Sequence, residues 1–152
     1  MKKVLSINIM LSLALNAYEC QYLSDFKMAG NKYNIDYKLL CAIAKIESNY
    51  NPFALNINNA NNYDIGILQI NSWWFPKLKK VGMDDPRMLL DYQYNIDVGS
   101  WILKECINNF GISKKSIDCY NKGETKAQNK SAYIKKVEKA YKKIMRKYKN
   151  EK

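Results

Sequence analysis

A glutamate at the end of an apolar helical face is the residue best placed for chemistry in this sequence. Leu39, Leu40, Ile43 and Ala44 follow the spacing of one buried helix face, and Glu47 takes the next position on it. Loss of solvation and the negative end of the helix dipole should both raise the pKa of Glu47 above about 4.3. Glu47 would then hold some proton at neutral pH and could act as a general acid. The alternative is a helix end at which Glu47 turns to water.

The helix that positions Glu47 is predicted to cover residues 36–48. Asp36 is a suitable N-cap residue because its side chain can accept a hydrogen bond from the first turn. Asn49, Asn51 and Pro52 follow directly and favour the end of a helix. Glu47 is therefore expected in the last turn.

An Asn-rich stretch, residues 49–63, should form a loop because asparagine favours turns. Metal binding there is not expected, since Asp64 is the only nearby carboxylate. The next run, residues 65–70, is apolar except for Gly66 and Gln69, and a glutamine in such a run needs a partner, either the backbone or a bound sugar. Three aromatic residues follow, whose rings could stack on sugars or pack in the core: Trp73, Trp74 and Phe75.

Apolar periodicity elsewhere predicts a single compact, mainly α-helical domain, with room for a small β-hairpin in the Asn-rich region. Gly99 should let a neighbouring helix approach closely. Further helices are expected over residues 22–33, about 91–110, 117–121 and about 129–149.

The N-terminus resembles an export signal. Lys2 and Lys3 precede an apolar run, residues 4–15, and a small residue, Ala17, follows at a suitable cleavage position. Residues 1–17 are therefore predicted to be a signal peptide, which leaves residues 18–152 as the mature domain and places it in the periplasm. An uncleaved membrane anchor is the alternative, although the run is too short to span a bilayer.

Four cysteines follow the proposed cleavage position, and in an exported protein this even number fits two disulfides. Four cysteines allow three pairings. Cys106 and Cys119 are spaced almost symmetrically about a break near Gly111, as partners across a helical hairpin would be. Cys41 could instead be a buried thiol. Zinc binding is not expected, because the chain has no histidine and no closely spaced cysteine pair.

The chain is strongly basic, with 25 Lys and Arg against 14 Asp and Glu. Without Lys2 and Lys3 the balance is 23 against 14, a net charge of +9. Such a surface favours anionic partners such as nucleic acid, acidic lipids or a cell wall with peptide carboxylates. Nucleic acid is disfavoured by the export signal and by the lack of a DNA-binding motif. Much of the charge also serves to keep Lys-rich helices soluble.

Four short segments, in this order, resemble the successive motifs of the soluble lytic transglycosylase family. They are AIAKIES with the following Asn, DIGILQIN, NIDVG and CYNKG, which begin at residues 42, 64, 95 and 119. The resemblance implies a goose-lysozyme-like helical fold and cleavage of peptidoglycan between N-acetylmuramic acid and N-acetylglucosamine, without a cofactor or metal. The small size is similar to that of monomeric transglycosylases that accompany type III and type IV secretion or conjugation machines.

The resemblance also assigns roles to particular residues. It implies that Glu47 is the catalytic acid and that Ser48 supports the helix end. Gly66 and Asn71 would shape the turn around a residue that borders the substrate cleft, Gln69. The other residues expected at the glycan are Tyr120, Asn121 and Tyr133.

The sequence departs from the family pattern at three positions. Cys119 and Lys122 stand where the family usually has alanine, so a disulfide or a charge near the cleft wall is expected. Leu68 replaces a methionine, a change that conserves volume.

Hydrolytic glycosidases usually pair an acid with a second carboxylate, and Asp64 alone could fill that role here. No feature of the sequence recommends Asp64. This favours the transglycosylase reaction, in which the muramic acid 6-hydroxyl attacks its own C1. A lysozyme-type hydrolase of the same fold and a non-catalytic peptidoglycan-binding assembly factor are the alternatives.

Overall fold

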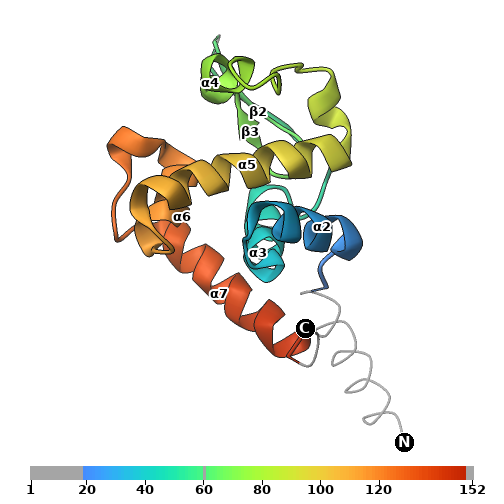
Figure 1. Cartoon of the computed structure of the whole chain (residues 1–152), viewed down its shortest axis with the longest axis vertical. Coiled ribbons are helices and arrows are strands. Elements are labelled where there is room, and N and C mark those ends of the chain that lie inside the picture. Colours follow the sequence, from blue (N-terminus) through green and yellow to red (C-terminus); the bar gives the residue numbers. More distant parts are fainter. Residues whose placement is uncertain (1–18, 60, 150–152) are drawn as a thin grey trace, which may run out of the picture.

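The computed structural model describes residues 19–59 and 61–149 and confirms the predicted mainly α-helical fold. The predicted signal peptide, residues 1–17, lies outside the described residues. Figure 1 shows the long α5 crossing the middle of the molecule, with the sheet and α4 above it and α2, α3 and α7 below. In chain order the elements are α2 (Leu23–Tyr33), α3 (Tyr37–Glu47), β1 (Leu55–Asn59), β2 (Asn62–Ile65), β3 (Ile70–Asn71), η1 (Ser72–Trp74), α4 (Phe75–Lys79), η2 (Met88–Leu90), α5 (Tyr92–Phe110), α6 (Lys114–Lys122), η3 (Glu124–Lys126) and α7 (Ala132–Lys147).

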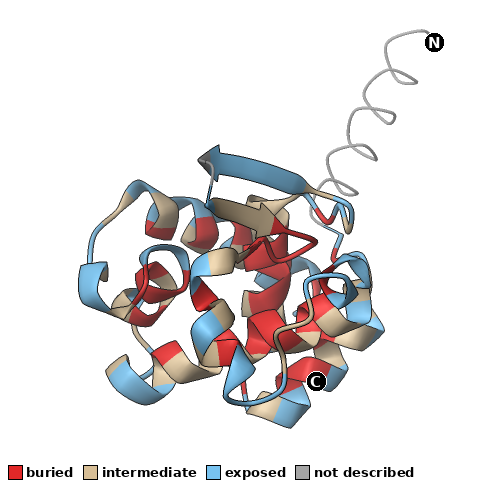
Figure 2. Cartoon of the chain, turned by 90° about the horizontal axis from the view of Figure 1, so that it is seen from above, coloured by how far each residue is buried: buried red, intermediate tan, exposed pale blue. Residues whose placement is uncertain are grey.

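Helix α3 forms the centre of the helical part and packs against α2 and α7. Every residue from Leu40 to Ala44 is buried, and Figure 2 shows buried residues gathered on the inward faces of the helices. Asp36 caps the helix by accepting a hydrogen bond from the Lys38 amide at 2.9 Å. The helix ends at Glu47 because Asn49 and Tyr50 adopt left-handed backbone conformations, with φ of 54° and 65°.

A three-stranded antiparallel sheet occupies part of the region predicted to be a loop, and its β1–β2 pair confirms the small β-hairpin predicted there. Asn56 and Asn58, expected in the loop, lie on strand β1, where Asn56 pairs with Asp64 of β2. Asparagine is depleted in strands, so the local preference of these residues favours a loop. The long-range bonds outweigh it, because Asn56 donates to Gln69 Oε1 at 2.5 Å and Asn58 donates to Asp64 Oδ2 at 2.8 Å.

Helix α5 fixes the segment between β2 and β3. The Asn95 side chain is fully buried, and both ends of its amide are hydrogen-bonded, because it donates to Ile65 O and Leu89 O and accepts from the Leu68 amide. A Cβ atom on Gly99 would lie 2.5 Å from Leu68 Cδ1. The sequence predicted that a neighbouring helix would approach closely at Gly99. The nearest neighbour is the Leu68 segment, and the Tyr120 hydroxyl of helix α6 would also lie 3.0 Å from that Cβ atom.

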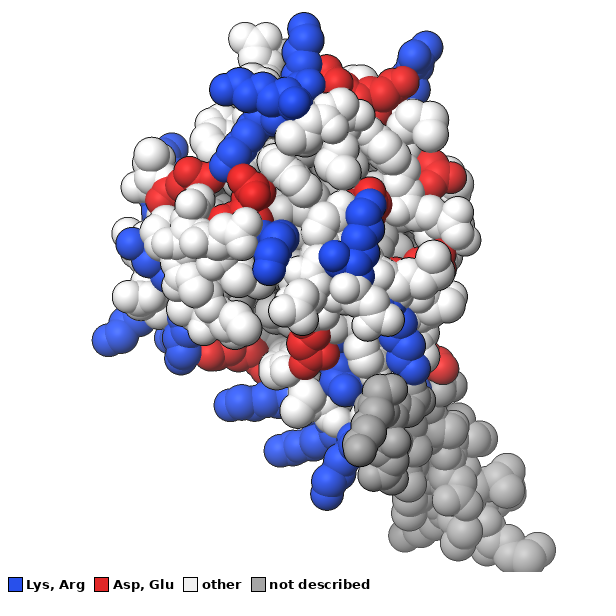
Figure 3. Space-filling model, viewed as in Figure 1, with Lys and Arg blue, Asp and Glu red and all other residues white. Residues whose placement is uncertain are grey.

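Helices α6 and α7 complete the domain. Ser113 caps α6 in a capping box with Ser116, which starts this helix earlier than predicted. Ser131 caps α7 through the Ile134 amide at 3.1 Å. The inward face of α7 is apolar, whereas its Lys and Arg side chains project outward along the lower part of the molecule (Figure 3). No helix in the described part of the chain is long and apolar enough to cross a bilayer.

Two disulfides join the helices. Cys106 of α5 is bonded to Cys119 of α6, as the symmetric spacing suggested. Cys20, just before α2, is bonded to Cys41 of α3. Cys41 is therefore a disulfide partner, which rules out the alternative of a buried thiol.

Replacing both Cys106 and Cys119 by Ser should lower the free energy of unfolding by about 3 kcal/mol, because the unfolded chain loses a closed loop. Urea unfolding under oxidising conditions measures this difference. Titration of free thiols in the variant should show that Cys20–Cys41 is still formed. If the variant and the wild type unfolded with the same urea midpoint and the same dependence on urea concentration, this would contradict a stabilising role for the Cys106–Cys119 bond.

Candidate active site

Glu47 lies partly buried at the C-terminal end of α3, and its carboxyl is bonded to the last helix. The Tyr133 hydroxyl donates to Glu47 Oε1 at 2.5 Å. Burial raises the pKa of Glu47 to about 7, and the negative charge of Asp64 acts in the same direction, whereas the bond from Tyr133 opposes the shift. Near neutral pH the carboxyl is therefore protonated in a large fraction of molecules.

Tyr133 remains a hydrogen-bond donor over the same pH range. Burial, together with the nearby carboxyl of Glu47, raises the pKa of the Tyr133 phenol well above its usual value. Because the phenol keeps its proton, it can stabilise the Glu47 carboxylate once the acid has lost its own.

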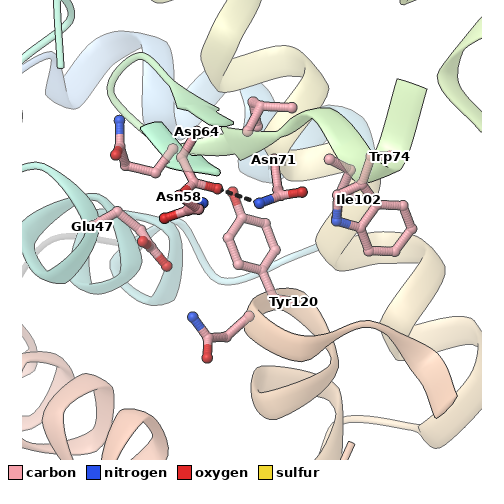
Figure 4. Close-up of a pocket in the computed structure, with 10 residues that line it drawn as sticks. Glu47, Asn58, Asp64, Asn71, Trp74, Ile102 and Tyr120 are labelled. Carbon is pink, nitrogen blue, oxygen red and sulfur yellow. Dashed lines mark hydrogen bonds between the residues drawn. The ribbon is translucent and has the colours of Figure 1, made fainter. Parts of the chain in front are cut away.

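A cavity of about 260 Å³ opens beside Glu47. Figure 4 shows Glu47 at one end of it and Trp74 at the other, with Asp64, Asn71 and Tyr120 between them. The lining residues are Glu47, Asn58, Asp64, Gln69, Ile70, Asn71, Trp74, Ile102, Tyr120 and Asn121. Asn58 and Ile102 could not be identified from the sequence, because a strand and a helix that are distant in the chain bring them here.

Gln69 borders the cavity, but its side-chain amide is used within the protein. It donates to Gly66 O at 2.8 Å and Ala54 O at 3.1 Å, and it accepts from Asn56. The partner that this buried glutamine needed is thus the backbone, together with one asparagine. Its own backbone is left-handed, with φ of 47°, a strained conformation that the surrounding bonds hold in place.

The segment 66–69 is fastened to both neighbouring helices α3 and α6. Ser48 donates to Ile67 O at 2.7 Å, and Tyr120 donates to Leu68 O at 2.7 Å. Gly66 is left-handed, with φ of 79°, and a Cβ atom there would lie 2.2 Å from Asn95 Nδ2. The backbone can take this path beside Asn95 only without a side chain at position 66.

Asp64 shares the cavity with Glu47. Its two oxygens accept hydrogen bonds from Asn71 at 2.6 Å and Asn58 at 2.8 Å. Asn71 also accepts from the Trp73 amide at 2.8 Å, so it both starts η1 and holds Asp64 in place. The sheet register, which sets Asp64 opposite Asn71, is the signal that the sequence alone did not provide.

The remaining predicted residues lie at different distances from the cavity. Asn121 lines it from the end of α6, and its side chain is exposed. Of the three aromatic residues, Trp74 lines the cavity, whereas Phe75 packs against Tyr63 with ring centroids 5.9 Å apart. Trp73 lies just beyond the cavity and is 55% exposed.

An inward-facing glutamate on a helix end and a polar cavity beside it, on a mainly helical fold with a small sheet, are consistent with a lysozyme-like domain. The chain belongs to the transglycosylase SLT domain family, whose model matches residues 24–143. It is similar to the invasion protein IagB of Salmonella typhi, with 33% identity over 118 residues that cover 76% of this chain and 74% of that protein. It is also similar to protein IpgF of Shigella sonnei, with 32% identity covering 78% and 77% of the two chains. The X polypeptide of Escherichia coli shows 32% identity, covering 80% and 75%.

The raised pKa of Glu47 predicts a pH-dependent cost in stability. Between the unfolded pKa of about 4.3 and the folded pKa of about 7, the folded state binds a proton that the unfolded state does not, so stability falls as the pH rises through this window. Glu47→Gln has no such titration. The free energy of unfolding of the variant, minus that of the wild type, should therefore rise by roughly 3 kcal/mol between pH 4 and pH 8. Urea unfolding at each pH measures the difference, and parallel profiles would contradict it.

Removing the hydroxyl of Tyr133 should move the pKa of Glu47 further upward. The bond from Tyr133 lowers this pKa, so Tyr133→Phe should raise it by about one unit. NMR titration of the Glu47 carboxyl carbon measures the shift. Tyr141→Phe is the matched control, because its hydroxyl bonds to Asp36 at 2.6 Å and should leave Glu47 unchanged. A downward shift in Tyr133→Phe would disprove the interpretation.

Proposed function

We propose that the protein is a peptidoglycan lytic transglycosylase that cleaves the β-1,4 bond between N-acetylmuramic acid and N-acetylglucosamine and leaves a 1,6-anhydro end. The observation that carries this proposal is the carboxyl of Glu47, protonated near neutrality and bonded to Tyr133 at one end of a polar cavity. Membership of the SLT family supports peptidoglycan as the substrate.

The reaction needs one group that first gives and then takes a proton. Glu47 donates its proton to the glycosidic oxygen as the bond from C1 to that oxygen breaks. The muramic acid 6-hydroxyl then bonds to C1 and passes its proton to the Glu47 carboxylate. The enzyme is restored and no water is consumed. A pKa near the working pH suits both steps, since neither protonation state is costly to reach.

Other side chains would position the glycan and the acid. Tyr133 stabilises the carboxylate that forms after the first step. Tyr120 and Gln69 hold the wall of the cavity in shape through bonds to the backbone, and the exposed amide of Asn121 is free to reach the sugar. No cofactor takes part in these steps.

Asp64 gives a specific reason to retain a second candidate, a lysozyme-type hydrolase. A retaining glycosidase places a second carboxylate across the sugar from its acid, and Asp64 lies in the same cavity as Glu47. The two asparagines that donate to Asp64 hold its carboxyl in one position in the cavity. Its negative charge could stabilise the positive charge that develops at C1 in either reaction, so the products decide between the two functions.

We further propose that the protein acts on the wall in the periplasm, as a monomer. The two disulfides suit an oxidising compartment, and residues 1–17 would direct export. Similarity to a protein named for invasion supports a role in opening the wall locally for a secretion or conjugation apparatus. A non-catalytic assembly factor would bind the wall without releasing fragments.

Incubation of the mature protein with purified sacculi, followed by mass spectrometry of the soluble products, tests the proposed reaction. Transglycosylation should release anhydro-muropeptides, each lighter by one water than the hydrolytic product. Glu47→Gln should reduce release by about a hundredfold or more, because it removes the general acid. Asp64→Asn should slow release without changing the type of product.

Glu138→Gln is the matched control, since this carboxyl lies outside the cavity on α7 and pairs with Lys114. It should retain full activity. Products with reducing ends would favour the hydrolase, and unchanged release by Glu47→Gln would refute the assignment of the acid.

A further inference from the structure

A second hollow of about 170 Å³ adjoins the cavity that contains Glu47. The two share three lining residues, Asn71, Trp74 and Asn121. Trp74 lies at the end of the first cavity away from Glu47 (Figure 4). Because the second hollow shares Trp74, we infer that it continues the groove away from the reacting carboxyl. A linear polymer whose cleaved bond lies at Glu47 would extend into this second hollow.

Trp73 gives the hollow a fixed and accessible aromatic surface. Its ring packs against the Gly123 backbone so closely that a Cβ atom there would lie 3.0 Å from the ring. It also meets Trp74 edge to face, with ring centroids 4.8 Å apart. Even so, 55% of Trp73 is exposed. A ring held in one orientation and left open suits contact with the apolar face of a sugar.

The charged groups that line the hollow are both positive. Lys126 makes no ion pair within the described ranges 19–59 and 61–149, and Lys122 pairs with the buried carboxylate of Asp118 at 3.1 Å. The nearest acid in sequence, Glu124, is bonded to Lys77 at 2.5 Å, which offsets its charge. Lys126 is therefore available to an anion that lies beside the sugar.

We propose that this hollow is a subsite for a sugar that carries an anionic peptide, with Trp73 contacting the sugar and Lys126 binding a peptide carboxylate. The proposal rests on the proposed function, because that function supplies the substrate. On strands that keep their peptides, a peptide with free carboxylates is attached to every second sugar, so an anionic group lies within two sugars of the cleaved bond. The subsite would make the protein prefer strands that still carry their peptides.

Binding measurements in a Glu47→Gln background test the subsite separately from catalysis. The ligands are soluble oligomers of alternating N-acetylglucosamine and N-acetylmuramic acid, of equal length, either with peptides or without them and with the muramic acid lactyl carboxyls blocked as neutral amides. Lys126→Ala should weaken binding of the peptide-bearing ligand about two- to fivefold, the range of an exposed ion pair, and leave the peptide-free ligand unchanged. Lys126→Glu should weaken the former further, and Trp73→Ala should weaken both.

Lys139→Ala is the matched control, because it removes one exposed charge from α7, outside the hollow. It should change neither affinity, and added salt should reduce the preference for the peptide-bearing ligand. Equal effects of Lys126→Glu on the two ligands, no effect on either, or failure of both ligands to bind would overturn the subsite. A clear preference combined with no cleavage by the wild type would instead overturn the proposed function alone.

Discussion

The fully buried amide of Asn95 fixes the backbone on which the candidate site is built. It bonds to residues on both sides of Gly66, so the chain from β2 to β3 can take only one path past α5. The carbonyls of that path are the acceptors for Ser48 and Tyr120. Helices that are distant in the sequence therefore meet on one short segment. A loop held in this way can keep a strained residue, Gln69, at the cavity wall.

The same scaffold explains how a carboxyl becomes an acid of suitable strength. Within the described part of the chain, no cation contributes to the pKa of Glu47, and burial together with Asp64 disfavours the charged form of its carboxyl. Tyr133 offers a single neutral donor, which limits the shift without abolishing it. A lysine or arginine in place of Tyr133 would hold the carboxyl ionised and remove the proton that the proposed reaction needs. The balance between burial and one hydrogen bond thus sets the chemistry.

The features that follow from local pattern could be predicted from the sequence. The apolar spacing located Glu47 on α3, Asp36 was recognisable as its cap, and the spacing about Gly111 suggested the Cys106–Cys119 bond. These depend on residues that are close in the chain, where periodicity and capping have a known geometry.

Features that depend on long-range pairing could not be predicted. Asn56 and Asn58 have the composition of a loop, and only the register with β2 shows why they form a strand. Asp64 could be named from the sequence as a possible second carboxylate, but only the sheet register, which sets it opposite Asn71, shows that it lies in the same cavity as Glu47. The partner of Cys20 depended on how the segment before α2 packs on α3.

The position of the end of helix α7 has a consequence for how a tether or a second domain could be joined to this protein. Tyr148, just after α7, accepts from the Cys20 amide at 3.0 Å and packs beside Tyr37, so both ends of the described domain meet near the start of α3. Glu47 lies ten residues further along that helix, about 15 Å away at 1.5 Å per residue. A tether or a fused domain at either end would therefore be attached about one helix length from Glu47. Because the two ends lie close together, they could also be linked and the chain opened elsewhere, which would give a circularly permuted protein with the same groove.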